Sequence, residues 1–255
     1  MIALVTGASS GIGRDISIEL AKRGIDIIAV ARNEERLNEL KNNIESTCHV
    51  KCTYKIVDLD NRESCKKLYN DVKNEFGKID ILINNAGFGL CGKFLETDLD
   101  KEINMIDTNI TSLHILTKLF LKDMVEQDCG YIMNVASIAG FMAGPLMATY
   151  YSTKNYVVRL SQAIRYELKE QKSKVKISCL CPGPVDTNFN NTANVKFSLK
   201  GASSDAVARY ATKQMFNNKF WILPGLGVKC TRFFAKIIPD NIMSNFCYNM
   251  QNKKI

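Results

Sequence analysis

Residues 6–13 are Thr-Gly-Ala-Ser-Ser-Gly-Ile-Gly, and they follow directly on the apolar run Ile-Ala-Leu-Val at residues 2–5. A helical pattern begins near Arg14. Glycines let the backbone turn tightly beside an anionic group, and a helix N-terminus offers free N–H groups and partial positive charge. A Gly-rich turn also occurs in ordinary strand-to-helix connections, but this one follows a strand, opens a helix and begins a βαβ unit. The stretch therefore predicts a parallel α/β sheet with a pyrophosphate site at its first turn.

The second predicted strand, residues 25–30, is followed by Ala-Arg-Asn at residues 31–33. A NAD-binding fold normally places Asp or Glu here to hold the ribose 2′-hydroxyl. Arg32 can instead pair its planar guanidinium with a 2′-phosphate, and Ser9 and Asn33 offer further hydrogen bonds. The alternative is that Arg32 only caps a surface loop. We interpret the pattern as a preference for NADP(H) over NAD.

Tyr150 and Lys154 stand four residues apart in a predicted helix, and Ser137 follows a strand-like run at residues 130–136. One helical turn places the phenol and the ammonium on the same face. The pair suits general acid/base chemistry at neutral pH. Moving a tyrosine pKa from ~10 to about 7 requires roughly 4 kcal/mol from nearby positive charge, much of which Lys154 can supply.

The same spacing occurs a second time, at Tyr69 and Lys73, in a predicted amphipathic surface helix. Spacing alone therefore does not identify a site. Context favours Tyr150, because the strand before it delivers Ser137 to the carboxyl end of a parallel sheet, where such sheets keep their chemistry. The alternative is a buried Tyr150 with a structural hydrogen bond.

With these motifs in hand, the chain resembles the classical short-chain dehydrogenase/reductase family over nearly its whole length. Alternating strands and helices also favour one Rossmann-like, doubly wound α/β domain over residues 1–255, with about seven parallel strands and helices on both faces. The resemblance implies cofactor contacts at Gly7, Ser9, Ser10, Gly11, Ile12, Gly13, Arg32, Asn33, Asp58, Leu59, Asn85, Ala86, Gly87, Tyr150, Lys154, Pro182, Gly183, Val185 and Thr187.

The resemblance also implies a catalytic tetrad of Asn109, Ser137, Tyr150 and Lys154. In the reductive direction the cofactor gives a hydride to a carbonyl carbon, and Tyr150 gives a proton to the oxygen. Ser137 stabilises the developing oxyanion, Lys154 lowers the Tyr150 pKa and holds the nicotinamide ribose, and Asn109 anchors a water. No metal is expected, because the two histidines lie far apart in the sequence and outside any ligand-like cluster.

These residues predict an NADP(H)-dependent reductase of a hydrophobic ketone or aldehyde, either a 3-oxoacyl thioester or a hydroxysteroid-like ketone. The alternative from another class is a catalytically silent NADP(H)-binding sensor or scaffold protein. We expect residues 88–97 and a substrate loop or lid at residues 188–240 to determine the substrate. No nucleic-acid partner is expected. The resemblance makes a homodimer through the helices of Asn109 and Tyr150 plausible, whereas the C-terminal quarter departs from the family's tetramer-building tail.

The positive charge is unevenly placed. The net charge is +8, and residues 196–255 hold ten Lys or Arg against Asp205 and Asp240. The same quarter is rich in aromatic residues. This basic aromatic segment could attract an anionic substrate, lie on an anionic membrane surface as an amphipathic helix, or form a pocket lid whose aromatics are core and whose lysines are solvated.

Length and composition complete the expectations. With 255 residues and 46% hydrophobic content, the chain can fill one large core. No apolar run reaches the ~18 residues of a membrane span, and the first strand leaves no room for a leader, so we expect a cytoplasmic protein. Nine cysteines without paired spacing, Cys179 and Cys181 among them, are expected to be reduced thiols.

Overall fold

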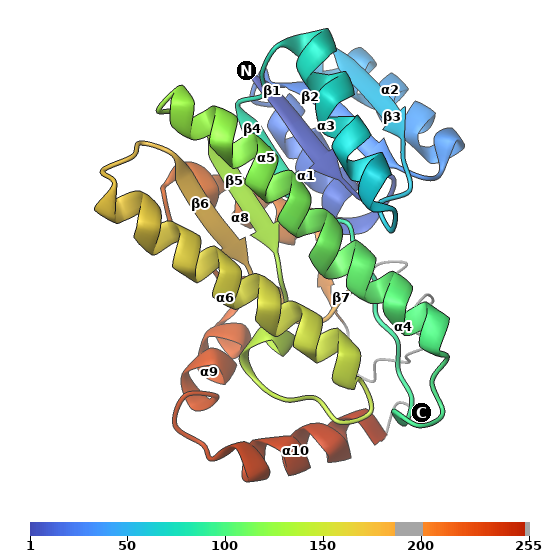
Figure 1. Cartoon of the computed structure of the whole chain (residues 1–255), viewed down its shortest axis with the longest axis vertical. Coiled ribbons are helices and arrows are strands. Elements are labelled where there is room, and N and C mark those ends of the chain that lie inside the picture. The colour runs from blue at the N-terminus through green and yellow to red at the C-terminus, as the bar shows by residue number, and fades with distance from the viewer. Residues whose placement is uncertain (187–200, 253–255) are drawn as a thin grey trace.

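The computed structural model describes residues 1–186 and 201–252, and its centre is a parallel sheet (Figure 1). The strand order is β3-β2-β1-β4-β5-β6-β9, and every neighbouring pair is parallel. The strands of this sheet are β1 (Ile2–Thr6), β2 (Asp26–Ala31), β3 (Cys52–Ile56), β4 (Ile81–Asn84), β5 (Tyr131–Val135), β6 (Lys176–Leu180) and β9 (Trp221–Ile222). A short parallel pair, β7 (Val185–Asp186) and β8 (Ala202–Ser203), lies outside it. The predicted seven-stranded, doubly wound fold is confirmed.

Helices cover both faces of the sheet because its strands are apolar on both sides. One core cluster joins the sheet to α1, α2 and α8, and a second joins the opposite face to α3, α5 and α6. The helices are α1 (Gly11–Ala21), α2 (Glu34–Cys48), α3 (Arg62–Phe76), α4 (Leu99–Ile106), α5 (Leu113–Glu126), α6 (Ala148–Glu170), α8 (Ser204–Phe216), α9 (Leu226–Phe234) and α10 (Asp240–Asn252). A π-helical segment, η1 (Asp107–Ser112), joins α4 to α5, and a 3₁₀ turn, η2 (Ile138–Phe141), follows β5.

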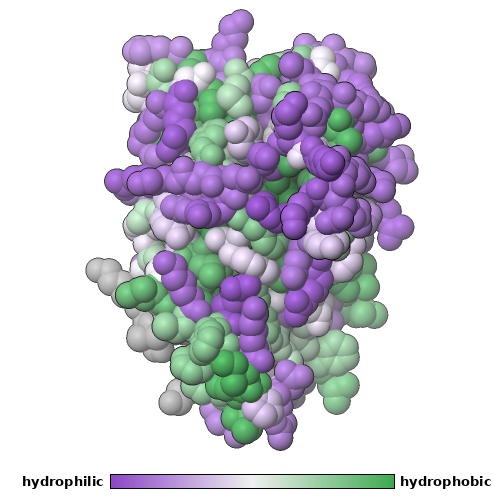
Figure 2. Space-filling view, turned by 90° about the vertical axis from the view of Figure 1, so that its left-hand side faces the viewer, coloured by the Kyte–Doolittle hydropathy of each residue, from purple (hydrophilic) through white to green (hydrophobic). Residues whose placement is uncertain are grey.

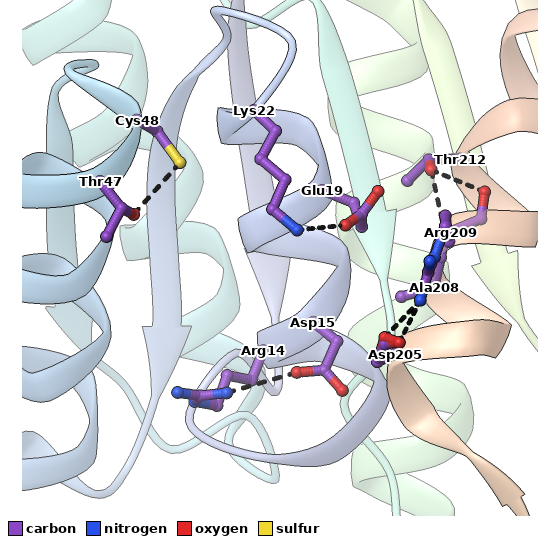
Figure 3. Close-up of polar contacts among 10 residues, drawn as sticks. All are labelled: Arg14, Asp15, Glu19, Lys22, Thr47, Cys48, Asp205, Ala208, Arg209 and Thr212. Atoms are coloured by element: carbon purple, nitrogen blue, oxygen red, sulfur yellow. Dashed lines mark hydrogen bonds and ion pairs between the residues drawn. The ribbon is translucent and has the colours of Figure 1, made fainter.

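The helices α1 and α8 pack side by side although they lie far apart in the sequence (Figure 3). Ser204 donates a hydrogen bond from the start of α8 to the Asp15 carboxylate on α1. Each helix also has an ion pair of its own, Lys22–Glu19 on α1 and Arg209–Asp205 on α8. Both ion pairs join residues of one helix and their cations are exposed, so they contribute little to the contact between the two helices. The apolar residues that α1 and α8 share therefore hold α8, and with it β9, in place.

The strand order reverses between β1 and β4, which both lie in the middle of the sheet. At such a switch point the connections leave in opposite directions and open a crevice at the carboxyl ends of the strands. Beyond that edge lie α9 and α10, at the lower end of the molecule in Figure 1. The C-terminal segment after β9 thus folds into two short helices. Among the described residues, no helix is both long enough and apolar enough to cross a membrane.

Candidate active site

The first turn of the sheet is built as an anion cradle. Gly7 and Gly11 have φ values of 65° and 54°, which residues other than glycine rarely adopt. Ser10 is the N-cap of α1, but its side chain makes no capping hydrogen bond. The first N–H groups of α1 are therefore left for an anion in the crevice.

Gly13 lies behind this cradle and leaves no space for a side chain. A Cβ there would stand 2.3 Å from Asn85 Nδ2 and 2.4 Å from the Gly7 carbonyl oxygen. Asn85 Nδ2 itself donates to the carbonyls of Thr6 and Gly7, at 3.0 and 3.2 Å. Thr6 Oγ1 completes the tie by accepting from the N–H groups of Asn85 and Ala86, both at 3.0 Å. The loop after β4 thus holds the Gly-rich turn in shape.

We expect Gly13→Ala to destabilise the protein and to weaken dinucleotide binding strongly. The new Cβ would displace backbone atoms, and overpacking of this kind costs about 1–3 kcal/mol. Thermal unfolding and titration with NADPH measure the two effects. Gly227→Ala is the control for stability, because a Cβ at Gly227 meets no atom within 4 Å. Equal melting temperatures for the Gly13 variant and wild type would contradict the account.

The structure brings Ser137, Tyr150 and Lys154 together at the carboxyl end of β5. Ser137 is the N-cap of η2 and accepts from the Ala139 N–H at 3.2 Å. Tyr150 and Lys154 come from the first turns of α6, and both are buried. Lys154 Nζ donates to the Val135 carbonyl at 3.1 Å and lies 5.8 Å from the centre of the Tyr150 ring.

The pKa of Tyr150 differs from the sequence-based expectation. Burial raises it to about 12, and the hydrogen bond with Ser137 lowers it only in part. Burial also lowers the pKa of Lys154 to about 8, because water is excluded from its ammonium group. The expected fall of the Tyr150 pKa toward neutrality is therefore not found, since desolvation outweighs the hydrogen bond with Ser137. The phenol is held in its protonated, proton-donating form.

Asn109 lies beside Gly87, as Lys154 does, but it does not line the crevice. Its Nδ2 donates to the Phe88 carbonyl at 2.9 Å and to Thr153 Oγ1 at 3.0 Å, and its Oδ1 accepts from the Phe88 N–H at 3.0 Å. It also lies in η1, and π-helical turns are frequent at functional sites. Its amide thus fixes the loop after β4 against α6, a role that the sequence did not indicate.

The second Tyr–Lys pair is a surface tie between α3 and α5. Tyr69 Oη donates to the Asp123 carboxylate at 3.0 Å, and Lys73 Nζ donates to Asp123 at 2.8 Å and to Tyr69 Oη at 3.0 Å. The hydrogen bond to Asp123 is the main reason that the pKa of Lys73 is raised. Neither Tyr69 nor Lys73 lines the crevice, so spacing without strand-end context marks no site.

We expect Tyr69→Phe to lower the free energy of unfolding by about 1 kcal/mol, the usual contribution of one hydrogen bond. The crevice is untouched, so dinucleotide binding and turnover should keep their wild-type values. Urea unfolding and steady-state kinetics are the measurements. A large loss of turnover would mean that the wrong pair has been chosen.

A cavity of about 900 Å³ runs through the crevice. Of the described residues proposed for the site, all line it except Gly13 and Asn109, which support it from behind. Thr187 lies outside the described residues. Arg32 lies at the dinucleotide end of the cavity, with Nη1 3.5 Å from Asp58 Oδ2, and its side chain is 71% exposed. Asn33 Oδ1 accepts from the Arg36 N–H at 2.8 Å as the N-cap of α2, so that oxygen serves the helix.

The far end of the cavity is apolar, and α10 forms part of its wall. Sequence reasoning placed the substrate residues at 88–97 and 188–240 and missed this helix; only Phe88 of the first range lines the cavity. Gln251 Nε2 donates to Tyr151 Oη at 2.8 Å, beside Tyr150. No motif in α10 distinguishes pocket lining from core. The lining residues of this end include Met142, Met147, Tyr151, Met243, Phe246, Cys247, Met250 and Gln251.

These features define an α/β dinucleotide-binding protein with a serine, a tyrosine and a lysine at the carboxyl end of its sheet. Residues 1–196 match the family model for short chain dehydrogenases. An uncharacterized oxidoreductase of Staphylococcus saprophyticus is 36% identical over 217 residues, which cover 84% of this chain and 91% of the relative. The chain belongs to the short-chain dehydrogenase family.

Solved structures agree. A short-chain dehydrogenase from Sphingobium yanoikuyae in complex with NADPH has a TM-score of 0.84 at 27% identity, covering 96% of this chain and 94% of that one. A short chain dehydrogenase/reductase from Burkholderia phymatum in complex with NAD has a TM-score of 0.83 at 22% identity, covering 91% and 92%, and shows likeness of fold alone. The protein is thus a member of an oxidoreductase family whose structural neighbours bind NADPH or NAD.

Proposed function

We propose that this protein is an NADP(H)-dependent oxidoreductase that interconverts a carbonyl and an alcohol on a hydrophobic substrate. The observation that carries the proposal is the meeting of Ser137, Tyr150 and Lys154 at one end of the crevice, beside an apolar cavity. The uncapped N-terminus of α1 and the tight contact at Gly13 support a dinucleotide at the other end.

The residues divide the chemistry between them. When bound, the nicotinamide supplies the hydride that reaches the carbonyl carbon. Tyr150 donates its phenolic proton to the carbonyl oxygen, and the alcohol is complete when the hydride and the proton have both been transferred. Ser137 donates a hydrogen bond to the oxygen as its negative charge grows. Lys154 provides positive charge beside the phenolate that remains, and Asn109 positions the loop through Phe88.

The preference for NADP(H) rests on Arg32. Arg32 and Ser9 both line the cavity. Arg32 occupies the position after the second strand where a carboxylate would favour NAD. In the described structure it pairs with Asp58, and an exposed pair at 3.5 Å is weak enough to yield to a phosphate dianion. The S. yanoikuyae neighbour, which holds NADPH, agrees with this preference.

The reductive rate should fall as the pH rises through about 8. Lysine is cationic below its pKa, and burial lowers that of Lys154 to about 8, so its charge is lost there and not near 10.5. Tyr150, with a pKa of about 12, stays protonated over the same interval. A pH profile of kcat for reduction measures the effect, and a flat profile up to pH 10 would contradict it.

The substrate is a ketone or aldehyde with a large apolar body. A 3-oxoacyl thioester and a hydroxysteroid-like ketone both suit the apolar part of the cavity. Consumption of NADPH and, separately, NADH against a panel of both classes and small aromatic carbonyls tests the proposal. Turnover of one class supports the enzyme. Tight NADP(H) binding without turnover of any carbonyl would favour the second candidate, a silent sensor. We further propose a cytoplasmic homodimer, paired through the helical segment that holds Asn109, from α4 through η1 to α5, and through α6, which holds Tyr150.

A further inference from the structure

Large hydrophobic side chains are exposed in unusual number on the last two helices. Half of the sixteen such side chains among the described residues lie between positions 226 and 250, with Leu226 78% exposed, Phe233 60% and Phe246 63%. Figure 2 shows hydrophobic residues gathered toward the lower end of the molecule, whereas the upper part is mostly hydrophilic. We call this set the apolar end: Leu226, Phe233, Phe234, Ile237, Ile242, Phe246, Tyr248 and Met250.

Helix α10 buries one side against the cavity, and most of its other residues are exposed apolar side chains and asparagines: Ile242, Phe246, Tyr248 and Met250 with Asn241, Asn245, Asn249 and Asn252. Met243, Cys247 and Gln251 are buried and line the cavity, whereas Ile242 and Phe246 are exposed on the outside. Its only charged residue is Asp240, at its first position. A helix that faces water normally carries charged residues on its outer side. The exposed side of α10 therefore combines apolar residues with asparagines and carries no charge after Asp240, a composition that suits an interface better than open water.

The charge of this segment identifies the kind of cover. Residues 226–255 contain five Lys or Arg and one acid, Asp240. Lys229 and Lys236 are exposed among the apolar residues. Arg232 is engaged instead with the protein, since its guanidinium stacks 4.1 Å from the centre of the Trp221 ring. Exposed aromatic and aliphatic residues interspersed with lysines match the interface of a bilayer that contains anionic lipid.

The cavity opens at the same end. Phe246 and Met250 both line it and are exposed, so they mark its mouth. The segment before and within α4 adds four exposed apolar side chains, Phe94, Leu95, Leu99 and Ile103. Figure 1 places this segment and the C-terminal part of α10 toward the same lower end of the molecule.

We propose that the apolar end docks on a lipid bilayer surface that carries anionic headgroups, with the mouth of the cavity toward the lipid. The phenylalanines and isoleucines enter the headgroup region, and Lys229 and Lys236 lie beside the phosphates. A hydrophobic substrate then reaches Tyr150 from the bilayer without crossing water. This last step rests on the proposed function, whereas the docking itself does not.

Flotation of the full chain with vesicles tests the docking without any turnover. The vesicles are phosphatidylcholine alone or with about 30% phosphatidylglycerol, which distinguishes apolar insertion from headgroup charge. We expect the protein to float with the anionic vesicles and more weakly with the neutral ones. The double variant Phe233→Ser/Phe234→Ser should bind the anionic vesicles about tenfold more weakly, and Lys229→Gln/Lys236→Gln should lose most of the advantage of anionic lipid.

The matched control is Ile56→Ser/Tyr166→Ser, which removes two exposed hydrophobic side chains from β3 and α6. It should float as the wild type does. Melting temperature and NADPH binding establish that each variant is folded. No flotation of the wild type, or equal flotation of the Phe233/Phe234 variant, would overturn the proposal. A second result would also overturn it: the wild type self-associates in sedimentation velocity, the Phe233/Phe234 variant does not, and the wild type does not bind vesicles. The apolar end would then be covered by a second copy.

Discussion

Tyr150→Phe is expected to lower kcat by about 10²- to 10⁴-fold, the range over which a positioned general acid acts. The substitution removes the phenolic proton and leaves the buried ring in its place. Bulk water is a far weaker acid than a phenol, so it is no ready substitute for this donor inside the crevice. Dinucleotide affinity should change little. Steady-state kinetics and a binding titration on the same preparation separate the two effects.

Tyr69→Phe is the matched control, since it also removes one hydroxyl from a Tyr–Lys pair one helical turn apart. It should turn over at the wild-type rate. Retention of full kcat by the Tyr150 variant on a substrate that the wild type reduces would show that another group donates the proton, and the assignment of Tyr150 would be abandoned.

Arg32→Asp is expected to weaken NADPH binding by about 100-fold. A hydrogen bond to a charged group contributes roughly 1.5–3 kcal/mol, and the substitution also places a second carboxylate beside Asp58, where it repels a phosphate. NADH should bind as well as before or better, because the new carboxylate can accept from the ribose hydroxyl. Dissociation constants for both dinucleotides measure the change.

Arg159→Asp makes the same charge change on the exposed side of α6, away from the cavity, and should leave both constants unchanged. If Arg32→Asp weakened the binding of NADH and NADPH equally, Arg32 would act only by supporting the fold of the loop. The proposed preference of the protein for NADP(H) would then be wrong.

Local sequence sufficed for the parts of the site that depend on short spacing. The glycines at 7, 11 and 13 follow from one strand-to-helix turn, and the Tyr150–Lys154 pair from one helical turn. Ser137 was placed by the end of its strand, and the structure confirms that all three side chains meet. Strand-end context also favoured Tyr150 over Tyr69, and of the two only Tyr150 lines the cavity.

What the sequence could not provide depends on long-range burial. The pKa of Tyr150 is set by the exclusion of water from the whole crevice, which spacing does not reveal. The wall formed by α10 was missed because methionine and cysteine have the same pattern in a core and in a pocket. The basic aromatic segment agrees with two different expectations. Phe220 and Trp221 pack into the protein, as expected of core aromatics, whereas Phe233 and Phe234 are exposed, as expected of a helix on a membrane surface.

Transfer of deuterium from NADPH labelled at the nicotinamide C4 tests the central claim most directly, because it follows the hydride itself. We expect an alcohol product that carries one deuterium on the former carbonyl carbon, at a rate that Tyr150→Phe reduces by about two to four orders of magnitude. Bound NADPH that keeps all its label in the presence of every carbonyl on the panel would contradict it.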